Sequence, residues 1–281
     1  MRFLLQRNWH TAVRLTGQDL ISEVTYCGTD QEVYACLVVD PQTFIVKGAT
    51  WEKYRTPTEK GQKTMNLTQL VGMEAYLGCG PTLRRLLAPL QDSFAQETFA
   101  ETVRGLTQAE TFLLQKRGYS SQKAYEDDWK EFYAGSCRFY SNLDQVTKGW
   151  YEYLGYHERR GILFNRLRNL VLAENGSGSE QFYLLTGQLC DSFHEVSVKL
   201  VVAKDDLSVK KATSHFLRVP DPICGEGAEL VKLIEGQKLL SMPKRKLAHL
   251  LRSSDNCVHL IDLVYEAVVA LEHWQKKGSS A

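Results

Sequence analysis

The sequence lacks the features that mark several large classes of protein. It contains no apolar run of about 18 residues, so no membrane-spanning helix is expected. The first residues contain no apolar core of the kind found in secretory signal peptides. Basic and acidic residues almost balance, with 34 Lys and Arg against 33 Asp and Glu. Nucleic-acid binders normally carry a basic surplus. We therefore expect a cytoplasmic protein without a membrane or nucleic-acid partner.

Standard catalytic and metal-binding motifs are also missing. The chain has no GxxxxGK[ST], GxGxxG, HExxH, GxSxG or CxxC pattern, which removes the sequence signs of the common nucleotide-binding, zinc-protease, serine-hydrolase and paired-cysteine sites. Seven cysteines are present. Without a secretion signal, free, catalytic or metal-binding thiols are more typical than disulfides.

An internal repeat organises the chain. Residues 27–57 align without a gap with residues 190–220, and twelve of the 31 aligned positions are identical. The shared residues include the first cysteine, a Leu-Val-Val run and an Arg-x-Pro ending. Such self-similarity indicates two copies of one structural unit. Coincidence between two generic hairpins is the alternative explanation.

Each copy has the same predicted element order. In the second copy, alternating apolar residues predict strands over 194–202 and 207–219. Helices are predicted over 224–235, 240–251 and 257–276 from apolar spacing and a following Gly236 or preceding polar cluster. Strands followed by a block of helices favour the α+β class.

Three regions follow from the repeat. The first copy occupies about 1–105 in degenerate form, an aromatic-rich helical insert occupies 106–165, and the second copy occupies 166–281. Aromatic residues recur at helical spacing in the insert: Tyr125, Trp129, Phe132, Tyr133 and Phe139. Such a stripe packs the copies together or, alternatively, offers a binding surface.

Three cysteines of the second copy stand at element ends. Cys190 precedes a strand, and Cys224 and Cys257 each begin a predicted helix, where the helix dipole stabilises a thiolate. Thiolates bind soft metal ions. Asp191 could add a carboxylate, and His259 could assist from two residues beyond Cys257. The alternative is three unrelated buried cysteines. The first copy keeps only Cys27, so a complete site is possible only in the second copy.

Part of this pattern resembles a bacterial domain family of uncharacterised function. The residues that carry the resemblance are the 185–191 segment, His194-Glu195, Arg218-Val219-Pro220, Cys224 and Cys257-Val258-His259-Leu260. The similar stretch covers about 165–272, with a degenerate counterpart over 2–105. Asn256 and Val258 depart from the Gly-Cys-Thr-His-Leu series of that family. The family implies no biochemical activity.

A more distant resemblance is to the iron–sulfur scaffolds IscU and the N-terminal domain of NifU. The order Cys190-Asp191, two strands, Cys224, a helix and Cys257 is similar to theirs, although both cysteine spacings differ. The resemblance implies two tandem α+β sandwich domains, each an antiparallel sheet followed by helices, joined by the insert. It also implies cluster ligation by Cys190, Asp191, Cys224 and Cys257, and a cysteine-desulfurase partner.

Three functional hypotheses remain open. The first is a non-enzymatic protein that binds an iron–sulfur cluster or zinc through Cys190, Asp191, Cys224 and Cys257, with His259 as a further metal ligand. The second is a structural or protein-interaction module that kept the fold and lost the metal site. The third is a thiol enzyme in which Cys257 or Cys224 is the nucleophile and His259 the base.

Overall fold

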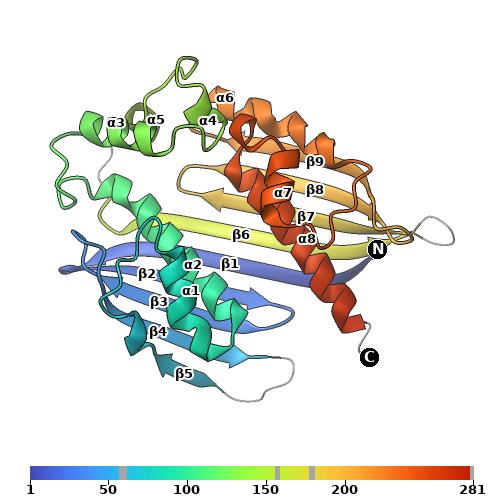
Figure 1. The fold of residues 1–281 in the computed structure, drawn as a ribbon, viewed down its shortest axis with the longest axis horizontal. Helices are drawn as coiled ribbons and strands as arrows, with labels where there is room; N and C mark the ends of the chain where they lie inside the picture. Colours follow the sequence, from blue (N-terminus) through green and yellow to red (C-terminus); the bar gives the residue numbers. More distant parts are fainter. Residues whose placement is uncertain (57–61, 156–158, 177–180, 279–281) are drawn as a thin grey trace. The chain divides into compact units, whose positions relative to one another are not determined.

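A computed structural model describes residues 1–56, 62–155, 159–176 and 181–278. Its strands are β1 (Arg2–Thr16), β2 (Asp19–Gly28), β3 (Glu32–Val39), β4 (Val46–Arg55), β5 (Lys63–Asn66), β6 (Ile162–Asn175), β7 (Phe182–Asp191), β8 (Glu195–Ala203) and β9 (Val209–Arg218) (Figure 1). Its α-helices are α1 (Gly80–Leu87), α2 (Ser93–Ala109), α3 (Gln122–Phe132), α4 (Arg138–Ser141), α5 (Trp150–Leu154), α6 (Pro222–Gly225), α7 (Lys244–Leu250) and α8 (Val258–Gly278). Short 3-10 helices include Glu226–Ile234, which continues α6.

The strands form one nine-stranded sheet in the order β5-β4-β3-β2-β1-β6-β7-β8-β9. The expected pair of tandem IscU/NifU-like sandwich domains is therefore wrong, although strands and helices are both abundant. The physical reason lies in β1 and β6, which are 15 and 14 residues long. They are neighbours in the strand order, so one ladder of hydrogen bonds continues where two separate sheets were expected.

The chain divides into two compact units, each with its own strands and helices. The β2–β5 unit comprises residues 8–125 and 157–167, and the β7–β9 unit comprises residues 1–7, 126–156 and 168–281. Each unit takes a part of β1 and of β6.

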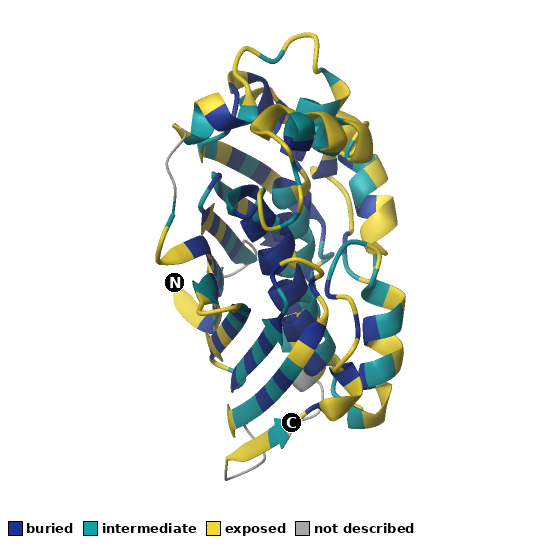
Figure 2. Ribbon diagram, turned by 90° about the vertical axis from the view of Figure 1, so that its left-hand side faces the viewer, coloured by how far each residue is buried: buried dark blue, intermediate teal, exposed yellow. Residues whose placement is uncertain are grey.

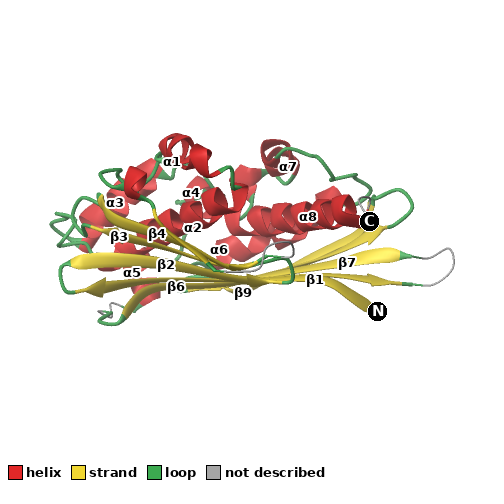
Figure 3. Cartoon of the chain, turned by 90° about the horizontal axis from the view of Figure 1, so that it is seen from below, coloured by secondary structure: helices red, strands yellow, loops and turns green. Residues whose placement is uncertain are grey.

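The β7–β9 unit has a core between its strands and α8. Side chains on β8 alternate between buried and partly exposed, and the stripes along the strands in Figure 2 show this two-residue period. Helix α8 contacts β7 and β8 along one face (Figure 3). Its buried residues recur every three or four positions, which gives it an apolar stripe toward the strands: Leu260, Leu263, Val264, Ala267, Val268 and Leu271.

The β2–β5 unit is built in the same way, with α2 contacting β2 and β3. Buried residues on β3 again alternate along the strand. Asp92 caps the start of α2, and its carboxylate accepts hydrogen bonds from the backbone N–H groups of Phe94 and Ala95.

The two strand ladders follow one register. Leu20 faces Val39 across β2 and β3, and Tyr183 faces Val202 across β7 and β8. Each residue of the second pair lies 163 positions after its counterpart in the first pair. The next pairs correspond too, since Glu32 faces Arg55 and Glu195 faces Arg218. The ladder irregularities fall at equivalent places, between Val38 and Val39 and between Val201 and Val202. Each residue of the first ladder therefore has an equivalent in the second, 163 positions later.

Of the residues that the structure describes, no helix combines the length and apolar character needed to cross a membrane.

Candidate metal centre

The centre begins at the tight turn between β7 and β8. The backbone N–H of Asp191 donates to His194 O at 2.8 Å and closes the turn. Asp191 Oδ1 accepts from the backbone N–H groups of Phe193, at 2.8 Å, and His194, at 2.6 Å. An aspartate that bonds to the backbone two and three residues ahead stabilises such a turn. The Asp191 side chain is fully buried, so these bonds also provide the polar partners that a buried carboxylate needs.

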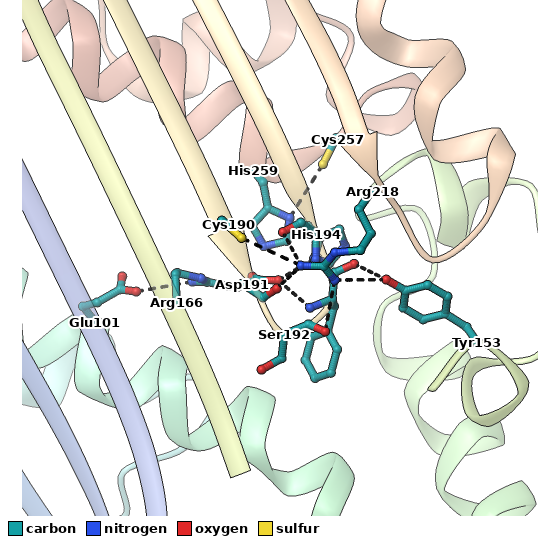
Figure 4. A network of polar contacts seen from close by, with 11 residues as sticks. Glu101, Tyr153, Arg166, Cys190, Asp191, Ser192, His194, Arg218, Cys257 and His259 are labelled. Carbon is teal, nitrogen blue, oxygen red and sulfur yellow. Dashed lines mark hydrogen bonds and ion pairs between the residues drawn. The ribbon is translucent and has the colours of Figure 1, made fainter. Parts of the chain in front are cut away.

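Two imidazoles meet this carboxylate. His194 Nδ1 lies 3.3 Å from Asp191 Oδ1. His259 belongs to the first turn of α8, and its ring centroid is 4.3 Å from that of His194. One ligand atom from each of the three residues lies within 4.8 Å of the other two (Figure 4). Neutral imidazole nitrogens and a carboxylate oxygen are ligands for divalent transition metals, and two histidines with one carboxylate leave coordination positions open.

The turn that carries Asp191 and His194 is held from outside by two side chains (Figure 4). The guanidinium of Arg218, at the end of β9, donates to the carbonyl oxygens of Asp191, Ser192 and His194. The hydroxyl of Tyr153 donates to Phe193 O at 2.5 Å. All four backbone carbonyls of residues 191–194 are thus hydrogen-bonded by Arg218 or Tyr153.

Of the predicted site residues, Asp191 and His259 belong to the group of possible metal ligands. Cys190 is exposed, on the opposite side of β7 from the buried Asp191, and its Sγ lies 3.9 Å from Arg218 Nη2. In the described part of the chain, the one group of three or more possible ligands is Asp191, His194 and His259. It includes none of Cys190, Cys224 and Cys257.

Cys257 and Cys224 are both buried. Cys257 lies next to the centre, and Cys224 lies in α6. Cys257 Sγ is 3.6 Å from His259 Nδ1. Burial raises the pKa of the Cys257 thiol to about 12, and burial raises the pKa of the Cys224 thiol to about 12 as well. Both side chains are therefore protonated thiols at neutral pH, which makes them poor nucleophiles.

The insert adds a fourth cysteine near this pair. Arg138, which follows Cys137, donates from its backbone N to Asn256 O and from its Nε to Ile223 O, both at 3.0 Å. Asn256 precedes Cys257 and Ile223 precedes Cys224, so three chain segments that each carry a cysteine meet at Arg138. The sequence comparison gave no sign of this meeting, because the insert has no counterpart in the repeat.

His194 is the member of this group that the sequence analysis did not predict as a ligand. A single histidine at the start of a predicted strand carries no spacing motif, and its usual place is at the surface. The alignment of residues 27–57 with residues 190–220 did contain a signal. In the first ladder, the positions of Asp191 and His194 are occupied by Gly28 and Gln31, and the turn still closes through Gly28 N and Gln31 O at 2.9 Å. Two metal-ligating residue types therefore appear in only one of two otherwise equivalent turns.

Comparison with known proteins finds one family model that matches part of this unit. Residues 184–271 match a family described as a protein of unknown function (DUF2889). This confirms the expected likeness to an uncharacterised family for that segment, which contains all three residues of the centre. No curated protein and no solved structure matches the chain. The resemblance to the iron–sulfur scaffolds therefore has no support from these comparisons.

Proposed function

We propose that this protein binds a divalent transition-metal ion through Asp191, His194 and His259. The observation that carries the proposal is the convergence of one ligand atom from each residue within 4.8 Å. Zinc and iron(II) suit a set of two imidazoles and one carboxylate. Three protein ligands leave coordination positions that water or another small ligand would fill.

Comparison of the ladders supports a role in binding over a role in folding. Arg55 donates to Gly28 O and Thr29 O in the first ladder, as Arg218 donates to Asp191 O and Ser192 O in the second. The arginine contact therefore serves the turn in both places. The backbone closure of the turn does not require these two residue types, because Gly28 and Gln31 close it in the first ladder, although Asp191 also stabilises its own turn. We infer that the ladders arose by duplication and that only the second acquired or kept the ligands.

The geometry favours a centre of nitrogen and oxygen ligands over a cluster held by cysteines. A cysteine-desulfurase partner would be required only for an iron–sulfur cluster, so our proposal does not include one. A thiol enzyme is supported only by the 3.6 Å contact between Cys257 and His259, and the raised pKa of Cys257 opposes it. All seven cysteines are free thiols, and we propose the reducing cytoplasm as the place where the protein works.

The test is metal binding by the purified protein after removal of bound metal with a chelator. Zinc, iron(II) and cobalt(II) would be titrated separately, with calorimetry and elemental analysis as readouts. We expect His194→Gln, which copies the first ladder, and His259→Ala to lose binding. His215→Ala removes an exposed histidine from β9 in the same unit and should bind like the parent.

Two results would overturn the proposal. One is a parent protein that binds none of the three ions. The other is undiminished binding by His194→Gln and His259→Ala, which would place the metal elsewhere. Absence of any binding would favour the interaction-module hypothesis.

A further inference from the structure

The peptide group between Phe193 and His194 is fixed at both of its polar ends. Its carbonyl oxygen accepts from Tyr153 Oη at 2.5 Å, and its N–H donates to Asp191 Oδ1 at 2.6 Å. A peptide group is planar, so two such bonds set the orientation of the whole plane. The Cα atom of His194 lies in the same plane, so the orientation of the plane constrains the direction in which the His194 side chain points.

Tyr153 also bonds to Arg218, and its helix contacts Phe193 through a second residue. Arg218 Nη1 donates to Tyr153 Oη at 3.3 Å. Trp150, one turn earlier in α5, packs edge-on against the Phe193 ring with centroids 4.9 Å apart. Helix α5 thus touches the turn through an aromatic contact and a hydrogen bond, both at Phe193, the residue before His194.

Helix α5 belongs to a segment that is anchored to the same unit at further points. The backbone N–H and hydroxyl of Thr147 donate to Asp221 Oδ2 at 2.8 and 2.7 Å. Arg138 bonds to Ile223 O and Asn256 O, as described above. Asn256 lies just before α8, the helix that supplies His259. The segment therefore contacts the chain beside both histidines of the centre.

We propose that Tyr153 is a positioning residue of the metal centre, and that the 126–155 segment acts through it to hold His194 in its ligating orientation. The inference rests on the proposed metal function. Side chains that orient a metal-ligating histidine typically contribute a factor of about 10 to 100 in metal affinity. Tyr153 acts one step further back, through the backbone, so the lower end of that range is expected.

The experiment compares the parent protein with Tyr153→Phe. The substitution keeps the ring of Tyr153 in α5 and removes only its hydroxyl. We expect cobalt(II) to bind about tenfold more weakly. The visible d–d bands of bound cobalt should also shift, because they report the geometry of its ligands. A loss of stability alone would not change the spectrum of the ion that remains bound.

The control is Tyr265→Phe in α8. Tyr265 is a partly buried tyrosine of the same unit, and Lys244 lies over its ring. The Tyr265→Phe variant should bind cobalt(II) with the affinity and spectrum of the parent. Equal affinity and spectrum in the parent and Tyr153→Phe would overturn the positioning role while the metal site stands. No cobalt, zinc or iron binding by the parent would instead overturn the proposed function.

Discussion

At the residue scale, burial of the Cys257 thiol makes the stability of the fold depend on pH. The Cys257 thiol has its pKa raised to about 12 by burial. An ordinary cysteine thiol has a pKa of about 8.5. At pH values between that pKa and the raised one, the unfolded chain loses a proton that the folded chain keeps. Stability from this group is therefore complete below about pH 8.5 and falls as pH rises. Because protonation is favoured in the folded state, alkaline conditions should weaken the fold through this residue.

We expect Cys257→Ala to show a weaker loss of stability above pH 8.5 than the parent protein does. The free energy of unfolding of the parent, relative to that of Cys257→Ala, should fall by about 1.4 kcal/mol per pH unit in that range. Urea unfolding of metal-free protein from pH 7.5 to 10.5 measures it. Val268→Ala truncates a buried, non-titrating residue of α8 and should lose stability equally at every pH. A difference between parent and Cys257→Ala that stays constant with pH would contradict the prediction.

At the scale of elements, α2 packs closely enough on its strands to require a glycine. A Cβ atom added at Gly105 would lie 2.9 Å from Thr11 Cγ2 and 3.0 Å from Val13 Cγ2. Replacing glycine by alanine inside a helix usually gains about 1 kcal/mol. Forcing extra volume into a packed contact costs about 1–3 kcal/mol, and this cost should exceed the gain.

Gly105→Ala should therefore lower the free energy of unfolding, by roughly 1 kcal/mol on balance. Thermal and urea unfolding of the metal-free protein provide the measurement. Gly225→Ala is the control, because nothing lies within 4 Å of its added Cβ and its φ of −70° suits alanine. An unchanged or increased stability of Gly105→Ala would show that the helix and strands can move apart without loss.

The elements also show what local sequence patterns can and cannot reveal. The predicted strands over 194–202 and 207–219 correspond to β8 and β9, and the predicted helix over 257–276 to α8. Alternation and helical spacing are local properties, so they were visible. The predicted helix over 224–235 is instead a short α6 followed by a 3-10 helix. The pairing order of β1 and β6 depends on contacts distant in sequence, which no local period encodes.

The dependence on contacts distant in sequence also explains why the sequence predicted the candidate centre only in part. Asp191 and His259 were expected as ligands because each adjoins a cysteine, yet the structure groups them with His194 and leaves the cysteines outside that group. Which residues of a turn face the first turn of a distant helix depends on how the helix packs. The sequence analysis placed Cys190 before a strand and beside Asp191 in one site, whereas both residues lie on β7, where neighbouring side chains point to opposite faces.

For the whole molecule, we expect the two ladders to differ in metal binding. In the first ladder, the position equivalent to Asp191 is Gly28, and an added Cβ there would lie 2.7 Å from Asp30 Oδ1 and 2.6 Å from Tyr26 Cζ. Tyr26 donates a hydrogen bond to Asp30 at this point. That pair fills the space that a ligating carboxylate would need, so the first turn has no room for one.

The chain should therefore bind one metal ion, although it contains two ladders of the same register. Titration of the parent protein with cobalt(II) is expected to saturate at one ion per chain. Gln31→His supplies the first turn with the counterpart of His194, and it should still saturate at one, because Gly28 cannot be replaced by a carboxylate without displacing Tyr26. A second ion in the parent or in Gln31→His would show that the first ladder can form a centre of its own. One ion in both would agree with a first turn that has no carboxylate at the position of Gly28.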